Sequence, residues 1–350
     1  MGDQREGPAS LAAANVQLAP AGTRRPGVEP FACASLIREI GRGKDGSKSL
    51  PRDQAETLMA AILDGQVGDL ELGGILLALR MKGEQHTEIA GFLDAIEART
   101  RRVTAPGLPV VVIPTYNGAR HAANLVPLLA GLLAKRGIPV LLHGQASDPA
   151  AQGAGSNVSR VSTVDILAKM GIEASANVYK AEDALHERLL AYLPLEVVSA
   201  PLARLISLRR ILGVRNVSHT LVKLLCPVSG PALLLSAYTH PEFGSMLNEL
   251  FAERGTSALL MRATEGEAVV NVRRSQEVLR WRNGQVETLA ERAPSAAAQL
   301  PELPPRDADS TAAWTLAVLA GDLPAPESLL AQCDMIEESA GLLDRRKGTR

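Results

Sequence analysis

The 350-residue sequence has few aromatic residues, 3% in all, and only 3 cysteines. So few rings leave little material for a stacking platform of the kind that grips single-stranded nucleic acid. Cys33, Cys226 and Cys333 lie far apart in the chain. Their spacing argues against a disulfide framework and against a sulfur-rich metal site, and it fits a reducing cytoplasm.

Long apolar runs and a strong charge of one sign are also missing. No stretch of about 18 apolar residues occurs, and the first residues lack a basic segment followed by an apolar one. We therefore expect neither a membrane span nor secretion. The 37 basic and 38 acidic residues nearly cancel, so the total charge favours no polyanionic partner. A nucleic-acid interface would need a local basic patch.

Signatures of several reaction classes are absent too. GRGKDGSK at Gly41–Lys48 lacks the spacing of a P-loop and follows an expected helix, so we interpret it as an exposed basic turn. The sequence contains no GxSxG or HExxH motif, and its 6 histidines are dispersed. These absences give no support to metal or nucleophile chemistry.

Length and composition suit an ordinary globular protein of about two domains. The 46% of hydrophobic residues can fill a sizeable core. Residues 1–30 are rich in alanine, glycine and proline without a period, which predicts a disordered leader. Residues 31–105 are predicted to form a small helical domain, and residues 106–350 an α/β domain.

Helical periodicity supports the first of these domains. One apolar stripe follows the spacing i, i+3, i+4 and i+7 and consists of Ile89, Phe92, Leu93 and Ile96. Asp69 and Thr87 are the N-cap candidates for two of the helices.

After residue 105 the pattern changes to short apolar runs separated by helical stretches. The expected strands are Val110–Ile113, Val140–Leu142, Ala232–Ala237 and Ser257–Met261, and the helices between them include Leu125–Ala134 and Glu242–Arg254. This alternation predicts a mostly parallel sheet with crossover helices.

Two further segments have a turn or loop character. Asn283–Gly284 joins Leu279–Arg282 to Gln285–Leu289, which predicts a hairpin with a type I′ turn. The small polar segment from Gln145 to Arg160 follows a strand and is interpreted as a mobile loop.

The stretch Val110–Leu129 predicts a strand, a tight turn and a helix, the arrangement that presents backbone N–H groups to a phosphate. A phosphate cradle would use several glycines, but this turn contains only Gly118. Tyr116 is the one aromatic residue well placed for stacking there.

PTYNGARHAAN at Pro114–Asn124 resembles, without a gap, the motif GTGGDGxHTFN of the anthranilate phosphoribosyltransferases. Further segments similar to that family are LHGQ at Leu142–Gln145, VSTVDILAKMG at Val161–Gly171 and LRRILGVRNVSHTLVKLLCP at Leu208–Pro227. The resemblance covers residues 31–341 and implies the nucleoside phosphorylase/phosphoribosyltransferase type of α/β fold, with a central, mostly parallel sheet. It also implies that helices within about 181–222 join the helical domain, and that a homodimer forms through that domain.

Departures from the family motifs concern the phosphoribosyl donor. Close approach of a pyrophosphate to backbone N–H groups needs glycine, yet Tyr116 stands in the turn. The family's magnesium-binding Asp-Glu pair aligns with Ala268 and Val269, which offer no carboxylate, although Glu265 and Glu267 are close in sequence. The resemblance thus implies weakened metal binding. We expect no cofactor, with Mg²⁺ reserved for a transferase alternative.

Three segments are similar to the YbiB-type branch of this group, whose members are described as DNA-binding proteins without demonstrated transferase activity. They are REIGRGK at Arg38–Lys44, DLELGGILLALRMKGE at Asp69–Glu84 and GVRNVSHTLVKLL at Gly213–Leu225. The resemblance therefore implies nucleic-acid binding on a phosphoribosyltransferase-like scaffold.

Charge placement gives this hypothesis an independent basis. No Asp or Glu occurs between Ala98 and Ser147 or between Val197 and Pro241. In the family fold both stretches face the cleft between the domains, so we expect an electropositive cleft, and in a dimer a longer basic track. The candidate nucleic-acid contacts in these stretches are Lys223, Arg209, Arg210, Arg120, Arg204 and Arg215.

Several candidates have an alternative role. Arg209 stands where family enzymes contact the carboxylate of anthranilate, so it is either an inherited substrate arginine or a phosphate contact. Lys223 replaces a family proline and is interpreted as a phosphate contact, with a solvated lysine as the alternative. Arg120 lies at a helix N-terminus, where a cation favours a bound anion. His143 and His219 are interpreted as interior or wall residues, not as acid–base catalysts.

The sequence thus predicts a homodimeric binder of the DNA or RNA phosphate backbone with little base preference and no catalytic residue. The alternative is a phosphoribosyltransferase with an unknown substrate. The residual phosphate-site turn is expected to comprise Thr115, Tyr116, Asn117, Gly118, Asn124, His143 and Gly144.

Overall fold

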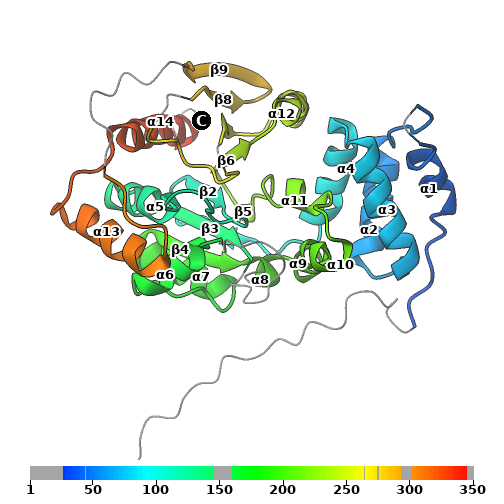
Figure 1. Cartoon of the computed structure of the whole chain (residues 1–350), viewed down its shortest axis with the longest axis horizontal. Coiled ribbons are helices and arrows are strands. Elements are labelled where there is room, and N and C mark those ends of the chain that lie inside the picture. Colours follow the sequence, from blue (N-terminus) through cyan, green and yellow to red (C-terminus); the bar gives the residue numbers. More distant parts are fainter. Residues whose placement is uncertain are drawn as a thin grey trace, which may run out of the picture.

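The computed structural model describes residues 27–43, 45–145, 160–263, 265–273, 276–292 and 302–344. They form an N-terminal helical domain and a larger α/β domain (Figure 1). Most of the expected leader, Lys44 of the basic turn and residues 146–159 of the expected mobile loop lie outside the described residues. The expectations for these segments stay predictions.

The helical domain contains α1 (Ala34–Ile40), α2 (Arg52–Leu63), α3 (Asp69–Lys82) and α4 (His86–Glu97). The backbones of α2 and α4 come close because Gly91 has no side chain. A Cβ at this position would lie 2.1 Å from the carbonyl oxygen of Arg52. Leu58 and Phe92 are fully buried in the core of this domain. The helical periodicity that predicted these elements is confirmed.

The two predicted N-caps lie one and two residues after the observed N-caps, which are Gly68 and Gln85. Helix α4 begins at His86, so Thr87 lies inside it, and Asp69 is the first residue of α3. At both helices a glutamate in the first turn does the capping instead. Glu71 accepts the backbone N–H of Gly68 at 2.9 Å, and Glu88 accepts that of Gln85 at 3.0 Å.

The α/β domain is built on a seven-stranded sheet with the order β4-β3-β2-β6-β7-β8-β9. Its strands are β2 (Val110–Pro114), β3 (Val140–Gly144), β4 (Leu190–Pro194), β6 (Ala232–Tyr238), β7 (Ala258–Arg262), β8 (Val278–Arg282) and β9 (Gln285–Ala290). Neighbours from β4 to β7 are parallel, and β8 and β9 pair antiparallel. The mostly parallel sheet is confirmed, and β4 is a strand that the sequence did not reveal. A separate short pair joins β1 (Val103–Thr104) and β5 (Val228–Ser229).

Helices cover both faces of the sheet, which explains why its central strands are apolar at successive positions. One face carries α5 (Val126–Lys135), α6 (Thr163–Lys169), α13 (Ala308–Ala320) and α14 (Glu327–Asp344), and the other carries α7 (Val178–Arg188) and α12 (Pro241–Arg254). In β2, Val111 and Ile113 belong to the core under the first group of helices. Val110 and Val112 belong to the core under the second.

Short helices connect this second core with the helical domain. They are α8 (Leu195–Val198), α9 (Ala200–Ser207), α10 (Arg209–Leu212) and α11 (Ser218–Leu221), and α9 to α11 lie beside the N-terminal bundle (Figure 1). Leu205 and Leu221 share one hydrophobic core with Phe92. Residues 181–222 were expected to contain helices that join the helical domain. Helix α7 lies partly in this range but packs against β4 and β1 instead.

The hairpin at the edge of the sheet has the predicted turn. Arg282 pairs with Gln285, and the two residues between them, Asn283 and Gly284, have φ angles of 52° and 74°. Positive φ at both central positions is the mark of a type I′ turn.

Two expectations for the whole chain concern cysteines and membranes. Cys33, Cys226 and Cys333 are all free thiols. Among the helices of the described ranges, none combines the length and the apolar character needed to cross a bilayer.

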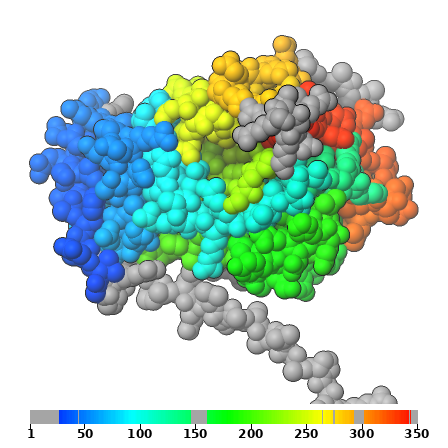
Figure 2. Space-filling model, turned by 180° about the vertical axis from the view of Figure 1, so that it is seen from behind, coloured from blue at the N-terminus to red at the C-terminus, as the bar shows by residue number. Residues whose placement is uncertain are grey.

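The parallel strands end at one edge of the sheet, and the strand order reverses between β2 and β6. Connections on either side of such a point leave toward opposite faces, as α5 and α12 do here, and a cleft forms between them. The turn after β2 and the loops after β6 and β7 meet at this edge. Figure 2 shows the molecule from behind, where the surface is hollowed between yellow and cyan segments of the chain.

Candidate functional site

The turn after β2 depends on its single glycine. Gly118 has a φ of 63°, and a Cβ there would lie 2.6 Å from the carbonyl oxygen of Val161. Ala119 and Val161 exchange two backbone hydrogen bonds of 3.0 and 2.9 Å, which fix this close approach. Position 118 therefore accepts only glycine.

Other residues of the expected phosphate-site turn use their polar groups internally. The side-chain amide of Asn124 donates to the hydroxyl of Thr163 at 2.9 Å, and its oxygen accepts the N–H of Val126 at 3.1 Å, which caps α5. Thr115 is hydrogen-bonded to Thr163 through their hydroxyls. A Cβ at Gly144 would lie 2.3 Å from the carbonyl oxygen of Thr115, so glycine lets β3 approach the turn.

Two carboxylates from the loop after β7 occupy the N–H groups of the turn. Oε1 of Glu267 accepts the backbone N–H groups of Asn117 and Gly118 at 2.8 and 2.7 Å. Glu265 accepts three more, from residues 120–122, at 2.5, 2.9 and 3.2 Å. Successive backbone N–H groups of a turn are suited to an anion, and here the anions belong to the chain itself. We call this arrangement the self-filled cradle.

Glu267 lies deep inside this cradle. The residue is 4% exposed, and its second oxygen, Oε2, has no hydrogen-bond partner among the described residues. Burial raises the pKa of the carboxyl group, whereas its hydrogen bonds with Thr115 and the turn, and the nearby charge of Lys223, oppose this shift. A partly compensated carboxylate therefore stands where the sequence predicted a phosphate.

The positions aligned with the family's metal pair do not fit a magnesium site. Ala268 is buried, and its carbonyl oxygen accepts a hydrogen bond from Gln332 of α14 at 3.1 Å. The same amide accepts the N–H of Val270 at 3.0 Å, so α14 holds this loop. Within the part of the chain that the structure describes, no group of three His, Cys, Asp or Glu residues could hold a metal ion. Glu265 and Glu267 are already engaged by backbone N–H groups.

Three guanidinium groups, the arginine cluster, gather on the cleft side of the turn. They belong to Arg160, Arg209 and Arg215. Arg215 donates to the side-chain oxygen of Asn117 at 2.6 Å, and Arg160 donates to the carbonyl oxygen of Gly118 at 3.0 Å. Sequence analysis named Arg209 and Arg215 as contacts but not Arg160, which is the last residue of the polar segment and lies outside both acid-free stretches.

The three charges of this cluster repel one another. Burial and the charges of Arg215 and Arg209 lower the pKa of Arg160, and burial and Arg215 lower that of Arg209. The carboxylate of Glu265 is 3.9 Å from Arg160. Among the described residues, Arg209 has no ion pair or hydrogen bond to its side chain. The cluster thus carries more positive charge than its surroundings balance.

A pocket of about 450 Å³ opens next to the cluster, between the helical and α/β domains. The end of α3 forms one wall, and α11, the end of β6 and the start of α12 form the others. We call it the interdomain pocket. Its lining includes Arg80, Tyr116, Arg215, His219, Lys223 and Tyr238.

Lys223 is a wall residue of this pocket. Its ammonium group donates to the carbonyl oxygen of Ala237 at 3.2 Å and lies 5.9 Å from the centre of the Tyr116 ring. Burial and the charge of Arg215 lower the pKa of Lys223 to about 8, against an opposing effect of Glu267. The alternative of a freely solvated lysine is therefore wrong, because the side chain is mostly enclosed.

Replacing Lys223 by methionine is expected to remove a pH dependence of stability. The lysine has a folded-state pKa of about 8, so the folded protein releases this proton at lower pH than the unfolded chain does. Between pH 7 and pH 10 the unfolding free energy of the native protein should rise by about 2 kcal/mol relative to Lys223→Met. Urea denaturation of both proteins at the two pH values measures this rise. A constant difference would contradict the prediction.

The two histidines of interest are interior residues, as predicted. His143 is fully buried, and its Nε2 lies 2.9 Å from the carbonyl oxygen of Leu225; burial lowers its pKa to about 4. His219 is 5% exposed, and burial with the charge of Arg215 lowers its pKa to about 3. Its ring meets that of Tyr116 edge-on at 5.9 Å. Both histidines are neutral at pH 7.

The remaining basic candidates lie around the site without lining the interdomain pocket. Arg210 is exposed on α10, and Arg204 is half-buried on α9. Arg120 contributes its backbone to the self-filled cradle, and its buried Nε has no hydrogen-bond partner in the described part of the chain. Of the six basic candidates, Arg215 and Lys223 thus line the pocket, and Arg209 is close enough to Arg215 for their charges to interact.

The acid-free stretches of sequence are not acid-free in space. Arg99 forms an ion pair of 2.7 Å with Asp64, and Arg136 one of 2.6 Å with Asp334. The charge of Glu267, from a distant segment, also acts on Lys223. Folding thus supplies carboxylates from elsewhere to some of these basic residues, and the electropositive cleft stays a prediction.

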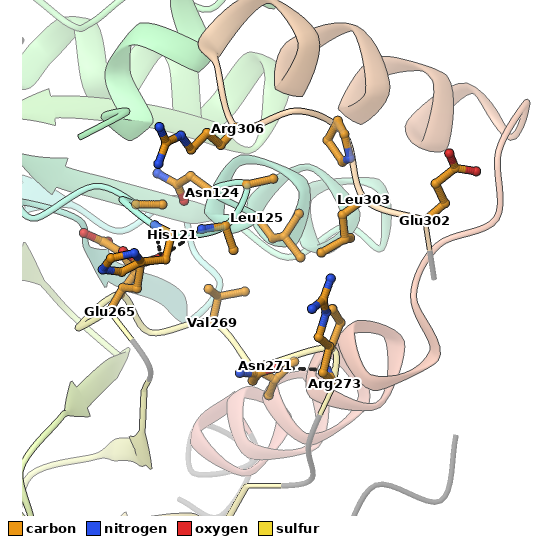
Figure 3. A pocket seen from close by; sticks show the side chains of 17 residues that line it. His121, Asn124, Leu125, Glu265, Val269, Asn271, Arg273, Glu302, Leu303 and Arg306 are labelled. Atoms are coloured by element: carbon orange, nitrogen blue, oxygen red, sulfur yellow. Dashed lines mark hydrogen bonds between the residues drawn. The ribbon is translucent and has the colours of Figure 1, made fainter. Parts of the chain in front are cut away.

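A second pocket, of about 750 Å³, lies beside the turn (Figure 3). His121, Asn124 and Leu125 form one side of it, and the loop through Val269 to Arg273 and the segment before α13 form the others. Arg306 of that segment donates to the carbonyl oxygen of Arg120 at 2.5 Å. This contact supports the self-filled cradle from outside.

Comparison with known proteins relates the chain to one superfamily. The family described as "Glycosyl transferase family, helical bundle domain" matches residues 34–99. The uncharacterized protein YbiB of Escherichia coli (strain K12) is 42% identical over 301 residues, which cover 85% of this chain and 91% of that protein. The anthranilate phosphoribosyltransferase of Desulfitobacterium hafniense (strain Y51) is 27% identical over 215 residues, and the match spans 61% of each protein.

Two solved structures share the fold. Anthranilate phosphoribosyltransferase from Thermus thermophilus has a TM-score of 0.63 at 22% identity, covering 89% of this chain and 97% of that one. The enzyme from Saccharomyces cerevisiae in complex with PRPP and Mg has a TM-score of 0.58 at 15% identity, with 89% and 94% covered. These likenesses confirm the predicted combination of a small helical domain with a larger α/β domain.

Proposed function

Because the chain belongs to the YbiB branch of the anthranilate phosphoribosyltransferase-like superfamily, we propose that it uses this scaffold to bind the phosphate backbone of nucleic acid. The observation that carries the proposal is the contrast across the turn. On one side the N–H groups are filled by Glu265 and Glu267, and on the other the arginine cluster faces the cleft with unbalanced charge. Binding without base readout follows from contacts to phosphate alone.

The self-filled cradle supports binding over phosphoribosyl transfer. A transferase must hold the pyrophosphate of its donor, and family enzymes would do so at this turn. Here the N–H groups of residues 117, 118 and 120–122 each already donate to a carboxylate. A pyrophosphate would have to displace both glutamates and would meet no carboxylate pair for Mg²⁺. We therefore propose a function that needs neither the donor nor a cofactor.

The arginine cluster supports phosphate as the ligand. Guanidinium groups match phosphate oxygens through paired N–H donors and remain charged even with a lowered pKa. A bound phosphate would relieve the repulsion among Arg160, Arg209 and Arg215. Arg210 is exposed on the same helix as Arg209 and would extend the contact along a strand.

The proposal includes a homodimer through the helical domain. Helix α3 exposes large apolar side chains at Leu70, Leu77 and Met81, with exposed fractions of 90%, 42% and 86%. These positions share one face of the helix with Gly73 and Gly74, whose missing side chains leave open space for a second backbone. Sedimentation of the protein without nucleic acid measures this association.

Arg209→Gln is the variant that tests nucleic-acid binding. Fluorescence anisotropy with a labelled 20-nucleotide strand should show affinity lower by about tenfold at 0.1 M salt, because one charged phosphate contact is lost. The slope of log affinity against log salt should fall by about 1. Arg282→Gln, in the hairpin at the far edge of the sheet, is the matched control and should bind as the native protein does.

The second candidate is a transferase, and the position of Arg209 favours it, since this residue aligns with the family's substrate arginine beside the interdomain pocket. Turnover of phosphoribosyl pyrophosphate with an aromatic amine, lost in Arg209→Gln, would establish that activity. Tight, salt-dependent binding of oligonucleotides without such turnover would establish the proposed one.

A further inference from the structure

Three of the few aromatic residues of the chain line the interdomain pocket. Of the 4 tyrosines and 4 phenylalanines, Tyr116, Tyr238 and Phe243 line this one pocket. His219 and His240 line it as well. Tyr238 stands at the end of β6 and Phe243 in the first turn of α12, so both come from rigid elements. Flat rings on rigid elements are the feature that a nucleobase stacks on.

Cations stand beside these rings. Arg215 and Lys223 line the same pocket, and Arg80 approaches from α3 in the helical domain. Glu84 and Glu242 add carboxyl groups, and burial raises the pKa of Glu84. The pocket therefore offers apolar rings, donors for a phosphate and acceptors for the N–H groups of a base edge. A nucleotide is the small ligand that uses all three.

The volume of about 450 Å³ also limits the occupant. Pockets of this volume enclose a single small ligand. The pocket is too small for a duplex, whose bases are paired and turned inward. A nucleotide can enter only if its base is unpaired.

We propose that the interdomain pocket takes one unpaired nucleotide of a bound strand. Its base packs against Tyr238 and Phe243, and its phosphate lies at Arg215 and Lys223. This inference rests on the proposed nucleic-acid binding, and it adds that the bound nucleic acid is single-stranded at the pocket. Single-stranded nucleic acid, or an unpaired end, is then the preferred ligand.

Three 20-nucleotide probes with the same backbone charge per strand test the inference on the full-length protein. They are a single strand, the matching duplex, and a single strand in which every nucleotide is abasic. At equal ionic strength the normal single strand should bind about tenfold more tightly than the duplex and the abasic strand, because only it can place a base in the pocket.

Tyr238→Ala should remove this tenfold preference while leaving the affinity for the abasic strand unchanged. Phe243→Leu keeps the apolar volume without the ring and should do the same if the alanine variant folds poorly. Tyr179→Ala removes a 73% exposed tyrosine on α7, outside the pocket, and should keep the preference.

The outcomes separate the two proposals. Equal affinity of all three probes would overturn the unpaired-nucleotide pocket and leave backbone binding standing. A preference for the normal single strand that persists in Tyr238→Ala and Phe243→Leu would place base contacts elsewhere and would also overturn it. If no probe binds, both proposals fail.

Discussion

Replacing Glu265 and Glu267 together by alanine is expected to lower the free energy of unfolding by about 3 kcal/mol. The substitution leaves the buried N–H groups of Asn117 and Gly118 without an acceptor, and it strips the N–H of Arg120 of its short hydrogen bond. Part of this cost is offset because a buried carboxylate with a raised pKa is removed. Urea denaturation at pH 7 measures the change.

Glu302→Ala is the matched control for this double variant. Glu302 lines the same pocket as Glu265 and Glu267 but is exposed, so its loss should change stability by less than about 0.5 kcal/mol. A double variant as stable as the native protein would mean that the turn does not depend on its two carboxylates.

The double variant should also acquire an anion site. Millimolar pyrophosphate can supply oxygens to the vacated N–H groups, so its melting temperature should rise with pyrophosphate concentration. The native protein should show a smaller rise, through the arginine cluster alone, because the N–H donors of its cradle are already bound. An equal rise in both proteins would contradict this prediction, because the vacated N–H groups would then add no binding.

Gly91→Ala is expected to destabilise the helical domain by about 3 kcal/mol or more. The added Cβ would meet the carbonyl oxygen of Arg52 at 2.1 Å and the backbone nitrogen of Glu56 at 2.8 Å. Both obstacles are backbone atoms of α2, so neither can move aside by changing a rotamer. The two helices would have to separate, which exposes core residues such as Leu58.

The control for this substitution is Gly341→Ala in α14. No heavy atom lies within 4 Å of a Cβ placed there, so the variant should gain a few tenths of a kcal/mol from helix propensity, roughly 0.5 kcal/mol. Circular dichroism during urea denaturation compares the two variants. A neutral Gly91→Ala would contradict the close contact of α2 and α4.

Features that depend on neighbouring residues could be predicted from the sequence. The apolar runs marked β2, β3, β6 and β7, because both faces of these strands are covered and successive positions within them are apolar. Asn283–Gly284 marked the hairpin, since only such residues accept positive φ at both central positions. Gly118 pointed to the sharp turn for the same reason.

Strand β4 was missed because its boundary carries no glycine. Helix α7 ends at Arg188, and the following residue, Leu189, adopts a left-handed φ of 58°, a conformation that usually belongs to glycine. Without that signal the run Leu190–Pro194 reads as an extension of the helix. Tertiary packing against β3 outweighs the local cost of the unusual backbone.

The chemistry of the site could not be predicted because it depends on contacts across the chain. Glu267 is 150 residues from Asn117 in the sequence, and no local pattern predicts that its carboxylate accepts the N–H groups of the turn. The alignment with family motifs placed Glu265 and Glu267 near the site but could not give their direction. In the same way, the sequence left Lys223 open between a phosphate contact and a solvated lysine, and the fold encloses it beside Tyr116.

The self-filled cradle makes the shape of the cleft independent of metabolite supply. An enzyme whose phosphate turn is completed by its substrate has a binding surface that varies with the concentration of that substrate and of magnesium. Here Glu265 and Glu267 are tethered to the chain and are always present. The arginine cluster on the other side of the turn therefore keeps one geometry whether the cell is rich or poor in nucleotides.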